Sequence, residues 1–156
     1  MDIFDQKKRS KIMSCVRGKN TRPELALRSA LHRMGLRFRL FRRDLPGTPD
    51  IVFARKRLAV QVRGCFWHQH TDCPAGRLPN SRLEFWRPKL QGNVARDAAK
   101  DAELTELGWK VLVIWECELK SAGAVALAAG RVAQELDSGV VAAVGIEPTR
   151  ARPEAF

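Results

Sequence analysis

The sequence predicts an α/β fold in which helices pack on a small mixed sheet. Three observations indicate it: a helix with its own N-terminal capping signal, a hairpin of two short apolar strands, and an apolar strand between two further helices. The chain has 156 residues, of which 45% are hydrophobic, and this is enough for one core. We therefore expect a single domain over residues 1–136 and a loosely ordered C-terminal tail over residues 137–156.

The first elements of this domain are a basic arm, a helix and a strand. Residues 1–20 are basic and lack periodicity, so they form either a short basic helix or a frayed terminus. Residues 21–24 (Thr-Arg-Pro-Glu) have the composition of a capping box, with Pro23 in the first turn, and predict a helix that ends at Gly35. Residues 36–40 alternate apolar and basic side chains, as a half-buried strand does.

A hairpin is predicted over residues 50–62. The preceding segment 45–49 (Leu-Pro-Gly-Thr-Pro) has the composition of a turn. Residues 51–53 form a short apolar strand, the basic residues 55–57 form the turn, and residues 58–62 form the returning strand.

The C-terminal half contains two more predicted helices with a strand between them. Residues 64–92 show little periodicity. We expect a helix over residues 93–107, ended by a glycine, then a core strand over 109–115 whose Trp109 and Trp115 pack, and a helix over 122–136.

The charge of the chain favours a polyanionic partner. Lys and Arg number 28 against 17 acidic residues, which gives a net charge of +11. Such an excess favours nucleic acid, because Lys and Arg displace counterions from phosphates; the alternative is a protein that is merely basic. No apolar run approaches the ~20 residues of a membrane span, and the N-terminus lacks the apolar region of a signal peptide. We expect a cytoplasmic protein.

Three cysteines and a histidine form a candidate zinc site. Thiolate and imidazole ligands suit tetrahedral Zn²⁺, and four protein ligands would make the site structural. The alternatives are buried cysteines without metal, or His68 as the histidine ligand. Disulfides are not expected in a reducing compartment, and Cys15 is expected to be an ordinary thiol. The proposed ligands are Cys65, His70, Cys73 and Cys117.

A candidate catalytic carboxylate follows the turn at the start of the hairpin. Pro49-Asp50 and then, about ten residues on, a polar pair in an apolar strand (residues 61–63, Gln-Val-Arg) outline the PD-(D/E)xK nucleases. A carboxylate at a strand end is expected to be exposed at the sheet edge, where it can hold Mg²⁺. The alternative is that Asp50 only caps the turn. Gln61 could add a ligand or a hydrogen bond.

Several longer motifs resemble the very-short-patch-repair (Vsr) endonucleases, over about residues 5–120. They are Gly-Cys-Phe-Trp-His at 64–68, Glu-Phe-Trp at 84–86, Asn-Val-x-Arg-Asp at 93–97, Leu-Gly-Trp-Lys-Val-Leu-Val-Ile-Trp-Glu-Cys at 107–117, Arg-Ser-Lys-x-Met at 9–13 and Leu-Pro-Gly-x-Pro-Asp at 45–50. The resemblance implies a restriction-endonuclease-like fold and Mg²⁺-dependent nicking. The implied substrate is the T-containing strand of a T·G mismatch left by deamination of 5-methylcytosine.

The resemblance also implies roles for individual residues. Asp50 corresponds to the metal-binding aspartate, and the Val62 carbonyl to a second contact with one or two Mg²⁺ ions. His68 corresponds to the histidine that activates or positions water, with Glu24 and Asp97 supporting the site. Without the resemblance, Glu24 could serve only the helix cap, and Asp97 could be a first-turn acid favoured by the helix dipole.

Three aromatic side chains correspond to the rings that the family inserts into the base stack beside the mismatch: Phe66, Trp67 and Trp86. The alternative is that they are core. The four zinc-ligand candidates also match the family's set, with one extra residue between His70 and Cys73, which leaves His68 for the active site.

One position departs from the family pattern. Members often carry Thr-His or Val-His before the Gly-Cys-Phe-Trp-His motif, whereas this chain has Val62-Arg63. Arg63 can bind a phosphate with two hydrogen bonds but cannot act as a base near pH 7. A nuclease with another DNA site or lesion, and a non-catalytic zinc-containing DNA-binding module, therefore stay open as alternatives.

The expected partner is double-stranded DNA with a T·G mismatch. The protein is expected to be a nucleoid-associated monomer, and mismatch-repair proteins are possible further partners. Basic side chains would hold the phosphates of the duplex. The candidates are Arg9, Lys11, Arg17, Lys19, Arg82, Arg87 and Lys89.

Overall fold

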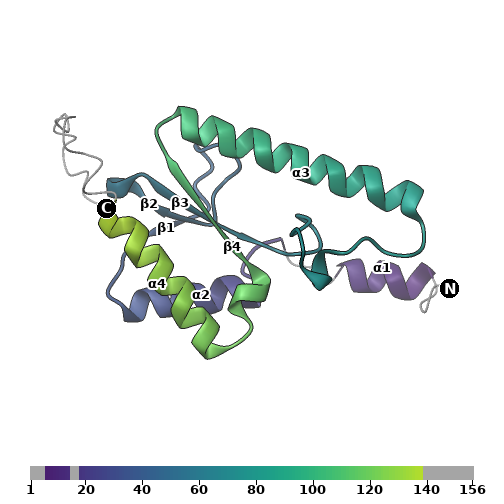
Figure 1. Ribbon diagram of the computed structural model, residues 1–156, viewed down its shortest axis with the longest axis horizontal. Helices are drawn as coiled ribbons and strands as arrows, with labels where there is room; N and C mark the ends of the chain where they lie inside the picture. The colour runs from purple at the N-terminus through teal and green to yellow at the C-terminus, as the bar shows by residue number, and fades with distance from the viewer. Residues whose placement is uncertain (1–5, 15–17, 139–156) are drawn as a thin grey trace.

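A four-stranded sheet lies at the centre of the molecule (Figure 1). The computed structural model describes residues 6–14 and 18–138. The strand order is β1-β2-β3-β4. β1 pairs with β2 and β2 pairs with β3 in antiparallel orientation, whereas β4 pairs with β3 in parallel. The predicted mixed sheet is therefore confirmed. The bounds are β1 Arg39–Leu40, β2 Ile51–Phe53, β3 Leu58–Arg63 and β4 Lys110–Trp115.

The register of the hairpin places the start of β2 beside the end of β3. Ile51 is opposite Val60, and Phe53 is opposite Leu58. Because the strands are antiparallel, the residue before β2 lies next to the last residues of β3. The predicted hairpin is confirmed, and it brings Asp50 to the same end of the sheet as Val62.

Helices cover both faces of the sheet (Figure 1). α2 (Arg22–Arg33) and α4 (Ala122–Ser138) lie on one face, and α3 (Leu83–Glu106) lies on the other. The larger core fills the space between the sheet and the α2–α4 pair, and a smaller cluster packs Leu104 of α3 against the opposite face. The most buried side chains of the larger core include Leu27, Leu31, Ile51, Val60, Ile114 and Val132.

The start and end of α2 follow the predicted signals. The Thr21 hydroxyl oxygen accepts the Glu24 N–H at 3.4 Å. The Glu24 carboxylate accepts the N–H of Asn20 at 3.0 Å, one residue before the position that a standard capping box uses. Gly35 follows the helix with φ +80°, a conformation that glycine adopts without a Cβ clash. The predicted first helix is therefore confirmed.

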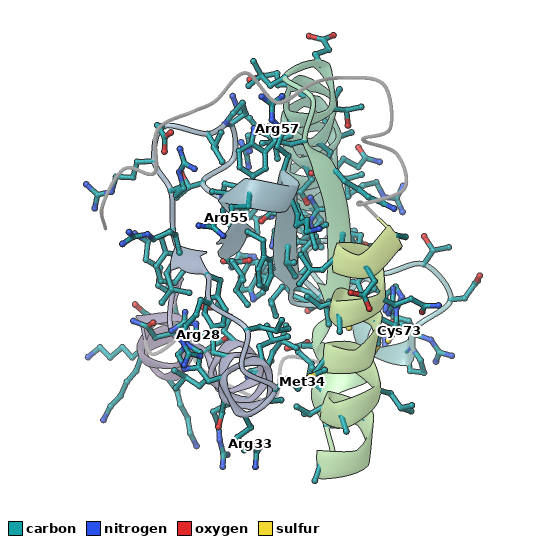
Figure 2. The ribbon with its side chains drawn as sticks, turned by 90° about the vertical axis from the view of Figure 1, so that its left-hand side faces the viewer. Arg28, Arg33, Met34, Arg55, Arg57 and Cys73 are labelled. Carbon is teal, nitrogen blue, oxygen red and sulfur yellow. The ribbon has the colours of Figure 1, made fainter. Side chains whose placement is uncertain are left out.

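The turn between β2 and β3 is a 3-10 helix over Ala54–Lys56, closed by Arg57 with φ +50°. Figure 2 shows Arg55 and Arg57 at this connection, away from Arg28 and Arg33 on α2. The positive charge of the chain is therefore spread over several elements.

The predicted strand over residues 36–40 is wrong in extent. Only Arg39–Leu40 pairs with β2. Phe38 instead stacks on His32, with 4.6 Å between ring centroids, and meets the edge of Phe53 at 5.7 Å. The apolar side chains of this segment thus pack on the core without a strand ladder.

The start of α3 was also predicted wrongly, ten residues too late. The helix begins at Leu83 and runs for 24 residues, with Pro88 inside it. Only Leu90 and Leu104 of α3 are buried. A helix that packs through few apolar residues shows little apolar periodicity, and this explains why the segment before residue 93 had no helical pattern.

The two ends of the chain are described in part. The basic arm contains α1 (Gln6–Ser14), and α4 extends two residues into the predicted tail 137–156. Cys15, Arg17, the Arg9 side chain and residues 139–156 lie outside the described residues. Within the described part, no helix has the length and apolar character to cross a membrane.

Replacing Gly130 with alanine should stabilise the protein. This exposed glycine lies inside α4, and an added Cβ meets nothing within 4 Å. Alanine in a helix interior is better than glycine by about 0.5–1 kcal/mol, so thermal unfolding should shift up by about 2–4 °C. The matched control is Gly108→Ala, which should destabilise, because Gly108 has φ +86° and Arg57 lies 3.0 Å from the added Cβ. A lower melting temperature for Gly130→Ala would contradict the packing described for α4.

Candidate active site and metal centre

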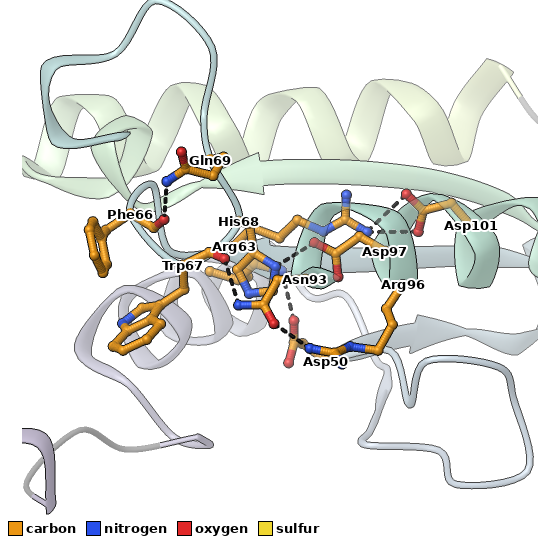
Figure 3. Close-up of polar contacts among 11 residues, drawn as sticks. Asp50, Arg63, Phe66, Trp67, His68, Gln69, Asn93, Arg96, Asp97 and Asp101 are labelled. Atoms are coloured by element: carbon orange, nitrogen blue, oxygen red, sulfur yellow. Dashed lines mark hydrogen bonds and ion pairs between the residues drawn. The ribbon is translucent and has the colours of Figure 1, made fainter. Parts of the chain in front are cut away.

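One pocket of about 380 Å³ brings together all five side chains predicted for catalysis. It lies where the start of β2, the end of β3 and the middle of α3 meet, and Figure 3 shows the polar contacts around Asp50, Arg63, His68 and Asp97. Basic side chains that sequence reasoning did not assign to the active site also line it: Lys19, Arg96 and Lys100. The predicted catalytic residues in the pocket are Glu24, Asp50, Arg63, His68 and Asp97.

Asp50 is half-buried, in contrast to the exposed carboxylate that its strand-end position predicted. Its Oδ2 accepts the Val62 N–H at 2.7 Å, which ties the start of β2 to the end of β3. Burial raises the pKa of Asp50 to about 6; the Val62 N–H opposes this shift, and the Glu24 carboxylate adds to it. Asp50 and Glu24 line the same pocket, so two carboxylates are available there to a cation.

Glu24 serves both the helix cap and the pocket. Its side chain is only 4% exposed, and one carboxylate oxygen lies 3.0 Å from Arg28 Nη2. The same oxygen accepts the Asn20 N–H. Glu24 therefore bonds the backbone just before the helix and also lines the pocket, so a role at the start of α2 does not exclude a role in the site.

His68 and Asp97 form a short hydrogen bond, with 2.6 Å between Nδ1 and Oδ2 (Figure 3). A neutral imidazole that donates from Nδ1 has its lone pair on Nε2, so the carboxylate fixes His68 as an acceptor at Nε2. The alternative that Asp97 is a first-turn helix acid is wrong, because α3 begins at Leu83.

Arg63 is paired with Asp101, a residue that sequence reasoning missed. Arg63 Nη2 donates to Oδ1 and Oδ2 of Asp101 at 2.7 and 2.9 Å. Asp101 lies four residues after Asp97, so both point from one face of α3. This four-residue spacing is the feature of the sequence from which Asp101 could have been predicted as a site residue. Gln61, held open as an extra ligand, is buried and lines the same pocket.

Four aromatic rings form a continuous cluster next to the pocket. Phe66 lies 5.1 Å from Trp67 and 5.3 Å from Trp86, between ring centroids. Phe85, also missed from the sequence, extends the cluster 5.2 Å beyond Trp86. None of these rings belongs to the buried core, and Phe85 is 43% exposed. The alternative that Phe66, Trp67 and Trp86 are core residues is therefore wrong.

Polar contacts and basic residues surround this aromatic cluster (Phe66, Trp67, Phe85 and Trp86). Asn93 Nδ2 donates to the Trp67 carbonyl at 3.0 Å, and Gln69 Nε2 to the Phe66 carbonyl at 2.6 Å (Figure 3). Arg82 and Lys89 lie over the Phe85 ring at 5.1 and 5.6 Å. Exposed cations beside exposed rings suit a polyanion whose bases can stack. The predicted phosphate-binding residues with exposed positions are Lys11, Lys19, Arg82, Arg87 and Lys89.

The four predicted zinc ligands converge at the end of the sheet. Their ligand atoms all lie within 4.8 Å of one another. His70 Nδ1 is 3.6 Å from Cys65 Sγ and 3.4 Å from Cys117 Sγ, and the His70 ring stacks on Trp115 at 4.2 Å. Burial raises the pKa of the Cys65 thiol to about 12, so this sulfur would ionise only beside a cation. Three sulfurs and one imidazole nitrogen fit a metal such as zinc, and the alternative ligand His68 lies in the pocket.

Comparison with known proteins identifies the family. The sequence model described as "DNA mismatch endonuclease Vsr" matches residues 1–74. The type II nicking enzyme V.XorIIP of Xanthomonas oryzae pv. oryzae is 55% identical over 124 residues, which cover 80% of this chain and 90% of the relative. The chain belongs to the Vsr family. The type II nicking enzyme V.NmeAIP of Neisseria meningitidis serogroup A is 37% identical over 139 residues, covering 89% of this chain and 99% of the relative. The DNA mismatch endonuclease Vsr of Escherichia coli strain K12 is 42% identical over 119 residues, 76% of each chain.

Membership of the Vsr family confirms the resemblance drawn from the sequence motifs. The matched residues of the family model include Glu24, Asp50 and His68. In this Vsr-family chain Glu24, Asp50, Arg63 and His68 therefore lie in the segment that the family model matches, whereas Asp97, Asp101 and the aromatic residues of α3 lie after it.

Proposed function

We propose that this protein is a DNA endonuclease that nicks the T-containing strand 5′ of a T·G mismatch produced by deamination of 5-methylcytosine, with Mg²⁺ as cofactor. The observation that carries the proposal is the convergence of Asp50, His68 and Asp97 in one pocket beside a partly exposed aromatic cluster. Family membership and the net charge of +11 support it.

Asp50 and the Val62 carbonyl would hold Mg²⁺, since both line the pocket and oxygen ligands suit a hard cation. Bound there, Mg²⁺ would supply positive charge for the scissile phosphate and lower the pKa of water. Four cysteine and histidine ligands would hold one structural Zn²⁺ and fix the loop that carries Phe66 and Trp67.

His68 would take the proton from the attacking water. Its Nδ1 hydrogen is held by Asp97, which leaves Nε2 to accept that proton and stabilises the imidazolium that forms. Glu24, buried in the same pocket, would assist by adding negative charge. Attack in line with the leaving oxygen would give a single nick.

The aromatic cluster would select the mismatch. Insertion of Phe66, Trp67 and Trp86 between bases costs a few kcal/mol of stacking, and less where the base pair is already weak. Exposed Lys and Arg side chains around the rings would bind the flanking phosphates. The rings would thus insert most readily at a mispair, where separating the bases costs less free energy.

A nicking assay tests this function. The substrates are one duplex with T·G and the same duplex with T·A, each with Mg²⁺ and with EDTA. We expect a single nick in the T strand of the T·G duplex, in Mg²⁺ only. A panel of other mismatches and of paired sequences covers the alternative DNA site or lesion. Tight binding without cleavage of any duplex would identify a non-catalytic DNA-binding module and refute the proposal.

Trp67→Ala should reduce the preference for the T·G duplex over the T·A duplex. Truncation of one stacked ring removes about 1–3 kcal/mol, so the ratio of nicking rates should fall about tenfold or more. The control is Leu127→Ala, which removes an apolar side chain that is 74% exposed on α4. An unchanged ratio for Trp67→Ala would exclude this ring from mismatch selection.

A further inference from the structure

We propose that Asp101 is a positioning residue that holds Arg63 in the orientation in which it binds the phosphate at the cleavage site. The proposal rests on the proposed function, because it assigns a role in the same pocket. Its basis is the pairing of both Asp101 oxygens with Arg63 Nη2, at 2.7 and 2.9 Å (Figure 3).

The pairing leaves donors of Arg63 free for a ligand. Within residues 18–138, both side-chain hydrogen bonds of Arg63 use Nη2. A guanidinium has five N–H donors in a planar fork, so Nε and Nη1 still point away from the carboxylate and can bind a phosphate oxygen. The Arg63 side chain is 12% exposed and lines the pocket that contains Asp50 and His68.

The position of Asp101 on α3 supports this role. Asn93, Asp97 and Asp101 are spaced by four residues along the helix, and each binds one residue of the segment 63–68. Asn93 binds the Trp67 carbonyl, Asp97 binds His68, and Asp101 binds Arg63. Side chains with this spacing lie on one face of a helix, so one face of α3 orients three successive parts of the site.

Positioning and simple electrostatics predict opposite effects for loss of the Asp101 charge. The pocket already contains Lys19, Arg96 and Lys100. If Asp101 acted only by its charge, its removal would make the pocket more positive and strengthen DNA binding. If it orients Arg63, its removal lets the guanidinium leave the productive geometry, and turnover falls while binding changes little.

The test is steady-state and single-turnover nicking of the T·G duplex in Mg²⁺ by Asp101→Asn, Arg63→Ala and the double variant. We expect kcat to fall at least tenfold for Asp101→Asn, with KM changed less than threefold. In the Arg63→Ala background the same substitution should lower kcat by less than threefold, because the two residues act as one unit. Asp101→Glu, which keeps the carboxylate, should restore part of the lost rate.

Glu106→Gln is the matched control, since it removes one exposed carboxylate from the same helix; its kcat should equal that of the unmodified protein. Thermal unfolding of each variant checks the fold. Arg63→Lys keeps the charge but not the planar guanidinium, so a loss of kcat in this variant would be a second test of the orientation of Arg63. An unchanged kcat with a lower KM for Asp101→Asn, or an equal loss in the Arg63→Ala background, would overturn the positioning role. Absence of nicking by the unmodified protein would instead refute the proposed function, and this inference with it.

Discussion

Replacing Asp50 with asparagine is expected to abolish nicking while DNA binding persists. Asparagine keeps the size of the side chain and an oxygen that can accept the Val62 N–H. It removes the charge that would hold the cation, and a bound metal ion supplies several kcal/mol of transition-state stabilisation. The nicking rate should therefore fall about a thousandfold or more, whereas the affinity for the T·G duplex should change by less than about threefold, because the phosphate contacts remain.

The measurement pairs single-turnover nicking with a gel-shift titration in Ca²⁺. Asp44→Asn is the matched control, because Asp44 is an exposed aspartate of the same loop that pairs with Arg42 at the surface. Its nicking rate should match that of the unmodified protein. Undiminished nicking by Asp50→Asn would remove this carboxylate from the mechanism.

Loss of one metal ligand should have the largest effect on stability. Cys117 follows β4, whereas the other three ligands lie in the loop after β3. In Cys117→Ser the cluster loses the ligand that joins this loop to the end of the sheet. Binding of a structural Zn²⁺ contributes on the order of 10 kcal/mol, comparable to the whole stability of a domain. We expect loss of the metal, a large fall in melting temperature and rapid proteolysis near residues 64–76.

Metal analysis after dialysis, together with thermal unfolding, checks this result. The unmodified protein should carry about one zinc per chain. The control is Cys15→Ser, because this fourth cysteine is expected to be an ordinary thiol; it should keep the metal and the melting temperature. A Cys117→Ser protein with full metal content would refute the four-ligand assignment.

Local signals were sufficient to predict most of the fold. Thr21 and Gly35 mark the ends of α2 by capping and left-handed backbone, which depend on neighbouring residues only. The hairpin of β2 and β3 follows from two short apolar runs with a turn between them. The three cysteines suggested a metal site because thiolates suit zinc, whereas the choice of His70 over His68 as the fourth ligand came from the family resemblance; the four ligand atoms do converge.

The features that the sequence did not predict depend on contacts between residues far apart in the chain. The first turns of α3 carry the exposed Leu83 and Phe85 rather than an apolar stripe, so no periodicity marks their start. Asp101 looks like any helix-surface acid until the parallel pairing of β3 and β4 places Arg63 opposite Trp115 and beside the helix. The surroundings of Asp50 likewise include the Val62 N–H and the charge of Glu24, which lie 12 and 26 residues away in the sequence.

The single uninterrupted length of α3 has a geometric consequence. Trp86 lies near the start of this helix, and Asp97 follows 11 residues later. At 1.5 Å per residue they are about 16 Å apart along the helix axis. In the proposed function one of these residues is at the opened base step and the other supports the histidine at the cut. Because one continuous helix, with Pro88 inside it, joins the two residues, the number of nucleotides from lesion to incision would stay constant. The protein, and not the DNA sequence, would then set this distance.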